Sequence, residues 1–225
     1  MSFAIAIDGP AGAGKSTIAK LAAKQLGFLY VDTGAMYRAV ALQLIREKTD
    51  PEDEEALRSA LEGTQIMLQY SDGVQHVLLN GEDVSGLIRT EEVSRMGSIS
   101  SAKAQVRQKL LSLQQTIARE NDCIMDGRDI GTKILPDAQL KIFLTASVEE
   151  RARRRFLEDQ QKGITSTLEE VMENIRSRDE RDTNRKVSPL RKSEDAVLID
   201  SSYMSIEEVV QKITELAQKR MHQEA

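Results

Sequence analysis

Short apolar runs alternate with longer amphipathic stretches along most of this chain. Runs with the length of buried strands, each bounded by turn or helix signals, are Phe3–Ile7, Phe28–Val31, Cys123–Met125, Leu140–Leu144 and Ala196–Ile199. Strands that alternate with helical patterns are typical of a parallel sheet with helices on both of its faces. The pattern therefore predicts an α/β fold.

One stretch, from Gly63 to Asp83, has a different pattern. The apolar segments Ile66–Tyr70 and Val77–Leu79 flank Ser71-Asp72-Gly73, which is a strong hairpin turn signal, and Asn80-Gly81 offers a second turn. An antiparallel hairpin within a parallel α/β chain predicts an inserted subdomain, at about residues 62–95.

Capping boxes, in which Ser or Thr and a Glu three positions later satisfy each other's backbone N–H groups, predict three helix starts: Ser147…Glu150, Thr167…Glu170 and Ser205…Glu208. After Thr167 an apolar seam at helical spacing comprises Leu168, Val171, Met172 and Ile175. The same face continues as Arg178, Arg181, Asp182 and Arg185. A core seam that turns cationic favours a helix that leaves the core to line an anion-filled cleft. The alternative is a solvated face with i,i+4 ion pairs.

Residues 9–16 read Gly-Pro-Ala-Gly-Ala-Gly-Lys-Ser, the spacing G-x-x-x-x-G-K-[ST] of a phosphate-binding loop. The loop lies between the first predicted strand and a predicted helix over Lys15–Leu26. Glycines let the backbone bend around an anion, and the helix N-terminus adds partial positive charge. Lys15 would reach the β- and γ-phosphates, and the Ser16 hydroxyl would bind Mg²⁺. The sequence therefore predicts a nucleoside triphosphate site.

Three further groups follow predicted strands. Asp126-Gly127-Arg128-Asp129 places a carboxylate where it can hold Mg²⁺ through water, although Asp-Gly alone also suits a plain turn. Asp32-Thr33-Gly34-Ala35-Met36-Tyr37-Arg38 can meet a second substrate or serve only as a helix N-cap. An arginine cluster comprises Arg151, Arg153, Arg154 and Arg155, which suits local phosphate handling or a solvated helix.

Composition narrows the function classes. The 225 residues suit one domain, and their net charge of −5 argues against a nucleic-acid binder with a general basic surface. No apolar run approaches the roughly 18 residues that a membrane helix needs, and Met1-Ser2 leads directly into the first strand, so we expect a cytoplasmic protein.

The single cysteine, Cys123, lies in an apolar run and is expected to be inert, and His76 and His222 offer no basis for a zinc site.

Taken together, these motifs resemble those of bacterial cytidylate (CMP/dCMP) kinases over essentially the whole chain. The shared motifs include the phosphate loop, Asp-Thr-Gly-Ala-Met-Tyr-Arg, Asn80-Gly81-Glu82-Asp83-Val84, Ile88-Arg89-Thr90, Asp-Gly-Arg-Asp-Ile-Gly-Thr and Arg178-Asp179-Glu180-Arg181-Asp182. The resemblance implies a nucleoside-monophosphate kinase fold in a single domain, residues 1–225, with a five-stranded parallel core. It also implies that residues 62–95 form a CMP-binding insert and residues 150–163 an arginine-rich lid.

The implied reaction is transfer of the γ-phosphoryl group from ATP·Mg²⁺ to CMP or dCMP. The resemblance assigns ATP and magnesium binding to the loop residues Gly9, Pro10, Ala11, Gly12, Ala13, Gly14, Lys15, Ser16 and Thr17. It assigns handling of the acceptor phosphate or the transferring group to Arg38, Arg128, Arg154 and Arg185. It assigns the cytosine edge to Ser98, Arg107 and Asp129, and the sugar to Arg178 and Asp182. Thr33 and Tyr37 complete the predicted substrate site.

Two other functions remain alternatives at this point. A uridylate or thymidylate kinase would keep the loop and the arginines but change the residues that read the base. A nucleotide-dependent switch would use hydrolysis for signalling, although the chain lacks the Asn-Lys-x-Asp motif of GTPases. We expect a monomer, because one core accounts for the apolar seams.

Overall fold

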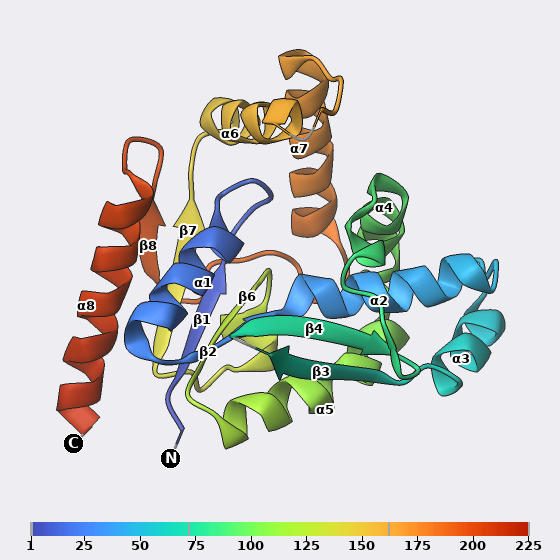
Figure 1. Ribbon diagram of the computed structural model, residues 1–225, viewed down its shortest axis with the longest axis horizontal. Helices are drawn as coiled ribbons and strands as arrows, with labels where there is room; N and C mark the ends of the chain where they lie inside the picture. Colours follow the sequence, from blue (N-terminus) through green and yellow to red (C-terminus); the bar gives the residue numbers. More distant parts are fainter. Residues whose placement is uncertain (1, 72, 162, 225) are drawn as a thin grey trace. The chain divides into compact units, whose positions relative to one another are not determined.

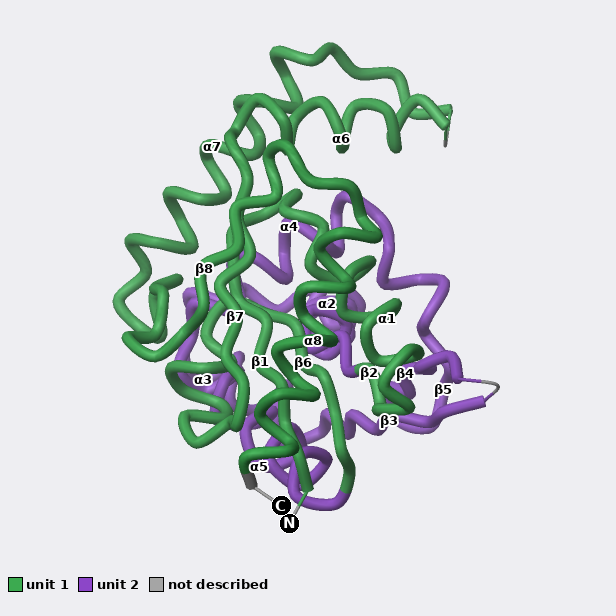
Figure 2. Tube along the Cα trace, turned by 90° about the vertical axis from the view of Figure 1, so that its left-hand side faces the viewer, with its two compact units in different colours: residues 1–30, 121–225 green, residues 31–120 purple. Residues whose placement is uncertain are grey.

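The computed structural model describes residues 2–71, 73–161 and 163–224. The chain divides into two compact units, coloured separately in Figure 2. Unit 1 comprises the residues up to Tyr30 together with those from Asn121 onward, and unit 2 comprises Val31–Glu120. No helix in the described ranges is both long enough and apolar enough to cross a bilayer.

Unit 1 is built on a five-stranded sheet, one edge strand of which ends in Val31 and Asp32 of unit 2 (Figure 1). Its strands, in spatial order, are β2 (Leu29–Asp32), β6 (Cys123–Gly127), β1 (Ala4–Asp8), β7 (Leu140–Thr145) and β8 (Val197–Asp200). The pairings of β1 with β6, β1 with β7 and β7 with β8 are all parallel. The predicted parallel sheet of five strands is confirmed, and each strand overlaps the apolar run that predicted it.

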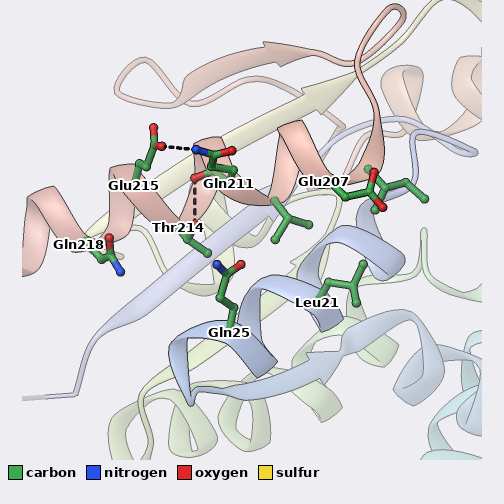
Figure 3. A pocket seen from close by; sticks show the side chains of 9 residues that line it. Leu21, Gln25, Glu207, Gln211, Thr214, Glu215 and Gln218 are labelled. Atoms are coloured by element: carbon green, nitrogen blue, oxygen red, sulfur yellow. Dashed lines mark hydrogen bonds between the residues drawn. The ribbon is translucent and has the colours of Figure 1, made fainter.

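Helices α1 (Lys15–Leu26) and α8 (Ile206–Glu224) pack against this sheet in unit 1. Their small and branched side chains, such as Ala19, Ala22 and Ile213, are fully buried against strand residues that include Ile5 and Ile142. Burial of such apolar surface supplies most of the free energy that holds these layers together. Between the outer faces of α1 and α8 lies a shallow groove (Figure 3), and none of the predicted site residues lines it.

Helices α6 (Val148–Gln161) and α7 (Leu168–Asn184) form a second packed pair in unit 1 (Figure 1). They bury Ala152, Val171 and Ile175 against Val148, Phe156, Leu168 and Met172. The predicted apolar seam of α7 therefore packs as expected. The capping box at Thr167 is complete, and the box at Ser205 is complete as well.

At Ser147 the capping box is only half formed. The Ser147 hydroxyl accepts from Glu150 N, as predicted, but the backbone N–H of Ser147 donates to Ser202 Oγ. The Glu150 carboxylate instead binds Arg153 and Arg154. A hydrogen bond to Ser202, which is distant in the sequence, therefore replaces the predicted hydrogen bond from Ser147 N–H to Glu150.

Unit 2 combines helices with a small antiparallel sheet. Its helices are α2 (Thr33–Arg46), α3 (Glu54–Glu62), the short 3₁₀ turn η1 (Leu87–Arg89), α4 (Glu91–Ser100) and α5 (Ala104–Glu120). Its sheet contains β3 (Ile66–Ser71), β4 (Val74–Leu79) and β5 (Glu82–Asp83), in that order. A separate core of this unit forms around Met36, Leu44, Leu57, Leu79 and Ile88.

Both predicted turns of this sheet connect antiparallel strands. Asn80 and Gly81 have φ values of 51° and 86°, the left-handed pair that a two-residue hairpin turn requires. In the first turn Gly73 also has a positive φ, while Asp72 lies outside the described residues. The role of residues 62–95 as a CMP-binding insert stays a prediction.

Candidate active site

The phosphate loop connects β1 to α1 and depends on its glycines. Gly9 has φ 153°, and a Cβ atom there would lie 1.9 Å from the backbone oxygen of Leu144. Gly14, the N-cap of α1, has φ 80° and gives the helix no side-chain cap, whereas Asp32, Thr90 and Thr167 cap their own helices. The first turn of α1 therefore keeps backbone N–H groups for a ligand, which makes it suited to an anion.

Lys15 lies in the wall of this loop. Its side chain is buried, and Nζ donates to the backbone oxygen of Pro10 at 2.7 Å. Burial holds the pKa of Lys15 well below its ordinary value, and the positive charge of Arg128 lowers it further. The nearby carboxylate of Asp126 opposes this effect only in part. A bound anion would relieve the cost of a buried cation, so the position favours a phosphate.

Ser16 and Asp126, the two residues predicted to hold Mg²⁺, lie side by side. Ser16 Oγ donates to Asp126 Oδ2 at 2.8 Å, and the Tyr30 hydroxyl donates to Oδ1 at 3.0 Å. One hydroxyl and one carboxylate are hard oxygen donors of the kind that Mg²⁺ takes when substrate phosphates and water complete its shell. Among the described residues there is no group of three or more His, Cys, Asp or Glu side chains that would hold a metal ion by itself.

The cationic end of α7 forms a network with the loop after β6. Arg128 Nε donates to Asp182 Oδ2 at 2.8 Å, while Arg185 lies 3.5 Å from Asp129 Oδ1 and 4.0 Å from Asp182 Oδ1. Burial alone would raise the pKa of Asp182, but Arg128, with Arg178 and Arg185, outweighs it and holds that pKa below its usual value. Half-buried arginines offset by fewer carboxylates are suited to a multiply charged anion.

The prediction that Arg181 continues the inward face of α7 is wrong. Arg181 is exposed, and it donates to Ser177 Oγ on its own helix. The seam continues through the half-buried Arg178 and the buried Asp182, whereas Arg185 lies beyond the end of α7 at Asn184, as the C-cap residue in an extended conformation. The alternative of a solvated face therefore fits Arg181, and the anion-filled cleft stays a prediction for the other three residues.

The arginines of α6 do not act as a single cluster. Arg153 is exposed and binds Glu150, and Arg155 pairs with Asp159. Arg154 donates to Glu150 and to both the hydroxyl and the backbone oxygen of Ser201. Its predicted role in phosphoryl transfer stays a prediction. Arg151 differs from the others, because it is buried and contacts the phosphate loop.

In unit 2, Asp32 at the end of β2 organises the start of α2. Its Oδ1 caps the helix by accepting from Ala35 N at 2.8 Å, and its Oδ2 lies 3.1 Å from Arg38 and 3.3 Å from Arg89. Thr33, the first residue of α2, is buried. The N-cap interpretation and the phosphate-handling interpretation of this motif are therefore compatible, since one carboxylate both caps the helix and holds two guanidinium groups.

Two of the three residues predicted to lie near the base, together with Tyr37, also belong to unit 2. The Arg107 guanidinium lies 5.3 Å from the centre of the Tyr37 ring and donates to the backbone oxygen of Ser101. Ser98 accepts from Ser101 Oγ through its backbone oxygen, while its own hydroxyl is buried and makes no hydrogen bond with any described residue. Asp129, the third such residue, lies in unit 1.

Several structurally important residues are not predicted from the sequence as site residues. Asp8 accepts from the backbone N–H groups of Ile130 and Gly131, both at 2.8 Å, and burial raises its pKa to about 6. Gln75 makes two hydrogen bonds with the backbone of Asp32. Arg89 is part of a motif that the resemblance uses, but its side-chain contact with Asp32 has no local sequence signal.

The sheet order, the phosphate loop and the buried lysine define a P-loop nucleotide-binding protein of the α/β class. The sequence model of the family described as cytidylate kinase matches residues 5–219. The chain belongs to the cytidylate kinase family.

Individual relatives agree with this assignment. A cytidylate kinase of Caldicellulosiruptor bescii is 52% identical over 215 residues, which cover 96% of this chain and 95% of the relative. A cytidylate kinase of Bacillus thuringiensis is 51% identical over 211 residues, 94% of each chain. A crystal structure of an uncharacterised Eubacterium ventriosum protein covers 96% of this chain and 99% of its own, with a TM-score of 0.54 and 12% identity. That last likeness shows the fold alone.

Proposed function

We propose that this chain transfers the γ-phosphoryl group of ATP to the 5′-phosphate of CMP or dCMP, giving CDP or dCDP and ADP. Membership of the cytidylate kinase family carries the proposal. The acceptor is already an anionic phosphate, so strong activation by a general base is not needed. The main task is to align two highly charged anions, which fits a chemistry of positioning and electrostatic stabilisation.

The donor site consists of the loop residues 9–17. Backbone N–H groups at the start of α1 bind the phosphates, and the buried Lys15 ammonium neutralises charge on the β- and γ-phosphates. The Ser16 hydroxyl would bind Mg²⁺ directly, and Asp126 would hold the ion through water. The hydrogen bond between these two side chains supports this assignment, because it places two hard oxygen donors 2.8 Å apart. When bound, the ion neutralises charge on the phosphates.

Family membership also supports roles toward the acceptor for residues of each unit. From unit 1, Arg128 and Arg185 bind the acceptor phosphate or the transferring group, Arg178 and Asp182 hold the sugar, and Asp129 reads cytosine. From unit 2, the contributors are Thr33, Tyr37, Arg38, Ser98 and Arg107. The unsatisfied hydroxyl of Ser98 supports a role in hydrogen bonding to the base. Arg154 joins the transferring phosphoryl group when residues 150–163 close as a lid, and closure excludes water.

An ADP-release assay with purified protein tests the proposal. ATP and Mg²⁺ are supplied with CMP, dCMP, UMP, dTMP or no acceptor, and we expect release with CMP and dCMP far above the rest. Release that is equally fast without an acceptor would indicate a nucleotide switch, and a preference for UMP or dTMP would indicate another monophosphate kinase. Mass measurement in solution tests the accompanying proposal that the enzyme is a monomer.

A further inference from the structure

Ala11, in the phosphate loop, has both of its backbone polar groups bound by charged side chains. Its N–H donates to Asp179 Oδ1 at 3.1 Å, and its carbonyl accepts from an Arg151 guanidinium nitrogen at 2.9 Å. The same nitrogen of Arg151 also donates to the second carboxylate oxygen of Asp179. Ala11, Arg151 and Asp179 therefore form a closed ring of hydrogen bonds that joins the loop to α6 and α7.

The ring lies in a sheltered environment. The side chain of Arg151 is 5% exposed and that of Asp179 is 20% exposed. Arg151 is fixed further by a hydrogen bond from Nε to the backbone oxygen of Ala146. Charge-assisted hydrogen bonds that are shielded from water are strong and directional, so this arrangement restricts the loop.

The neighbouring glycine shows how closely the helices approach the loop. A Cβ atom on Gly12 would lie 3.2 Å from Cβ of Arg151 on α6 and 3.4 Å from Cδ1 of Ile175 on α7. Both helices therefore pack directly on the loop, and a displacement of either one is transmitted to it. None of the proposed roles in phosphoryl transfer uses Arg151 or Asp179.

We propose that Arg151 and Asp179 are positioning residues for the nucleoside triphosphate. They fix the backbone of Ala11, so that the loop is already shaped for phosphates when the nucleotide arrives, and they hold α6 and α7 against the loop. The inference rests on the proposed function, because it assigns these residues to the ATP side of that reaction.

The charges of Arg151 and Asp179 should affect ATP affinity in opposite ways. Asp179 places a carboxylate beside an anion-binding loop, and Arg151 neutralises it. Removal of Arg151 leaves that carboxylate uncompensated, so the triphosphate is repelled as well as less well positioned. Removal of the Asp179 charge weakens the positioning of the loop but adds no repulsion of the triphosphate. A second substitution at Asp179 should therefore restore part of the ATP affinity that is lost by substitution of Arg151.

The test compares Arg151→Met, Asp179→Asn and the double variant, with Asp159→Asn as the matched control. Asp159 pairs with Arg155 within α6 at 3.0 Å, so the control removes an ion pair from the same helix without touching the loop. Calorimetry gives the Kd for ATP, and steady-state kinetics give KM for ATP and for CMP separately. We expect Arg151→Met to raise the Kd for ATP by about 10-fold or more and Asp179→Asn by less, with the double variant between them.

In all three variants we expect the KM for CMP to change by less than about twofold. Equal increases in both KM values, or an ATP affinity like that of Asp159→Asn, would overturn the assignment. Should Arg151→Met fail to fold, Asp179→Asn decides: wild-type ATP affinity in that variant overturns the inference. Absence of CMP-dependent ADP release by the wild type contradicts the proposed function instead, and the ATP titrations still judge the positioning role.

Discussion

The hydroxyl of Ser16 donates to the carboxylate of Asp126 across 2.8 Å, although 110 positions separate the two residues in the sequence. The parallel register of the sheet brings them together. Ile7 of β1 pairs with Asp126 of β6, so the loop that follows β1 folds over the carboxyl end of β6. Ligand sites of open α/β sheets form at such ends. A contact between these two residues therefore follows from the order of two strands.

Lys15→Ala removes the buried ammonium group that we propose binds the phosphates. We expect kcat to fall by about 10²–10³-fold, as for loss of one fixed electrostatic group at a reacting centre. The thermal unfolding temperature should change little, since burial already disfavours the charged lysine. Lys24→Ala, at an exposed position near the end of the same helix, is the control. Near-normal turnover of Lys15→Ala would contradict the phosphate-loop assignment.

Arg185→Ala tests the cationic end of the α7 face. The Arg185 side chain is 7% exposed and lies near both Asp129 and Asp182, so its loss should lower kcat/KM by about 10³-fold. Arg181→Ala, on the exposed side of α7, should change stability by no more than about 0.5 kcal/mol and leave activity unchanged. If both variants retain wild-type kcat/KM, Arg185 has no part in catalysis.

Asp129→Ala tests how the base is chosen. Cytosine presents an amino donor where uracil presents a carbonyl oxygen, so a carboxylate attracts CMP and repels UMP. One good contact to a base edge is worth about 1–3 kcal/mol, or about 5- to 150-fold in kcat/KM. We expect Asp129→Ala to lose most of its efficiency with CMP and much less with UMP. An equal loss with both substrates would assign Asp129 a structural role through Arg185.

Asp8 gives stability a specific dependence on pH. Its folded pKa of about 6 lies above the ordinary 3.8 because burial penalises the ionised form. The native state therefore binds more protons than the unfolded state between these values, and stability falls as pH rises through that window, by about 3 kcal/mol. The Asn side chain of Asp8→Asn does not ionise, so the stability of this variant lacks this dependence on pH.

Urea unfolding at several pH values between 4 and 7.5 measures the effect. Asp8→Asn should be less stable than the wild type at low pH, because an amide oxygen cannot serve both N–H donors as well as a carboxyl group does. The difference should shrink as pH rises. A difference that stays constant across the range would show that Asp8 does not titrate in the folded protein within this window.

Local patterns predict much of this fold because they act over few residues. The apolar runs predict the strands of the sheet, and Asn80-Gly81 predicts a turn that needs two left-handed residues. The buried seam through Val171 and Ile175 predicts the inward face of α7, which continues to the buried Asp182. These features depend on period and backbone conformation, which a sequence displays directly.

The environments of other side chains depend on contacts with residues that are distant in the sequence, which local patterns do not predict. Arg151 reads like its neighbours in a run of arginines, yet it alone is buried, because Ala11 and Asp179 satisfy its guanidinium group. Arg181 has the spacing of the seam but lies on the solvent side, where Ser177 binds it. Asp8 ends a strand like many polar residues, and its importance depends on two N–H groups more than 120 residues away.

The chain's single thiol, Cys123, is fully buried in β6, and burial raises its pKa to about 12. A thiol that stays protonated and shielded does not react with maleimides or iodoacetamides. The native cysteine therefore does not compete with an introduced cysteine for thiol-reactive dyes. One cysteine introduced on the solvent side of α6 and another at a surface position of α8 would accept a donor and an acceptor dye. Energy transfer between the two dyes would report in real time whether α6 moves relative to α8 when ATP binds, with no need to replace a native residue in the core.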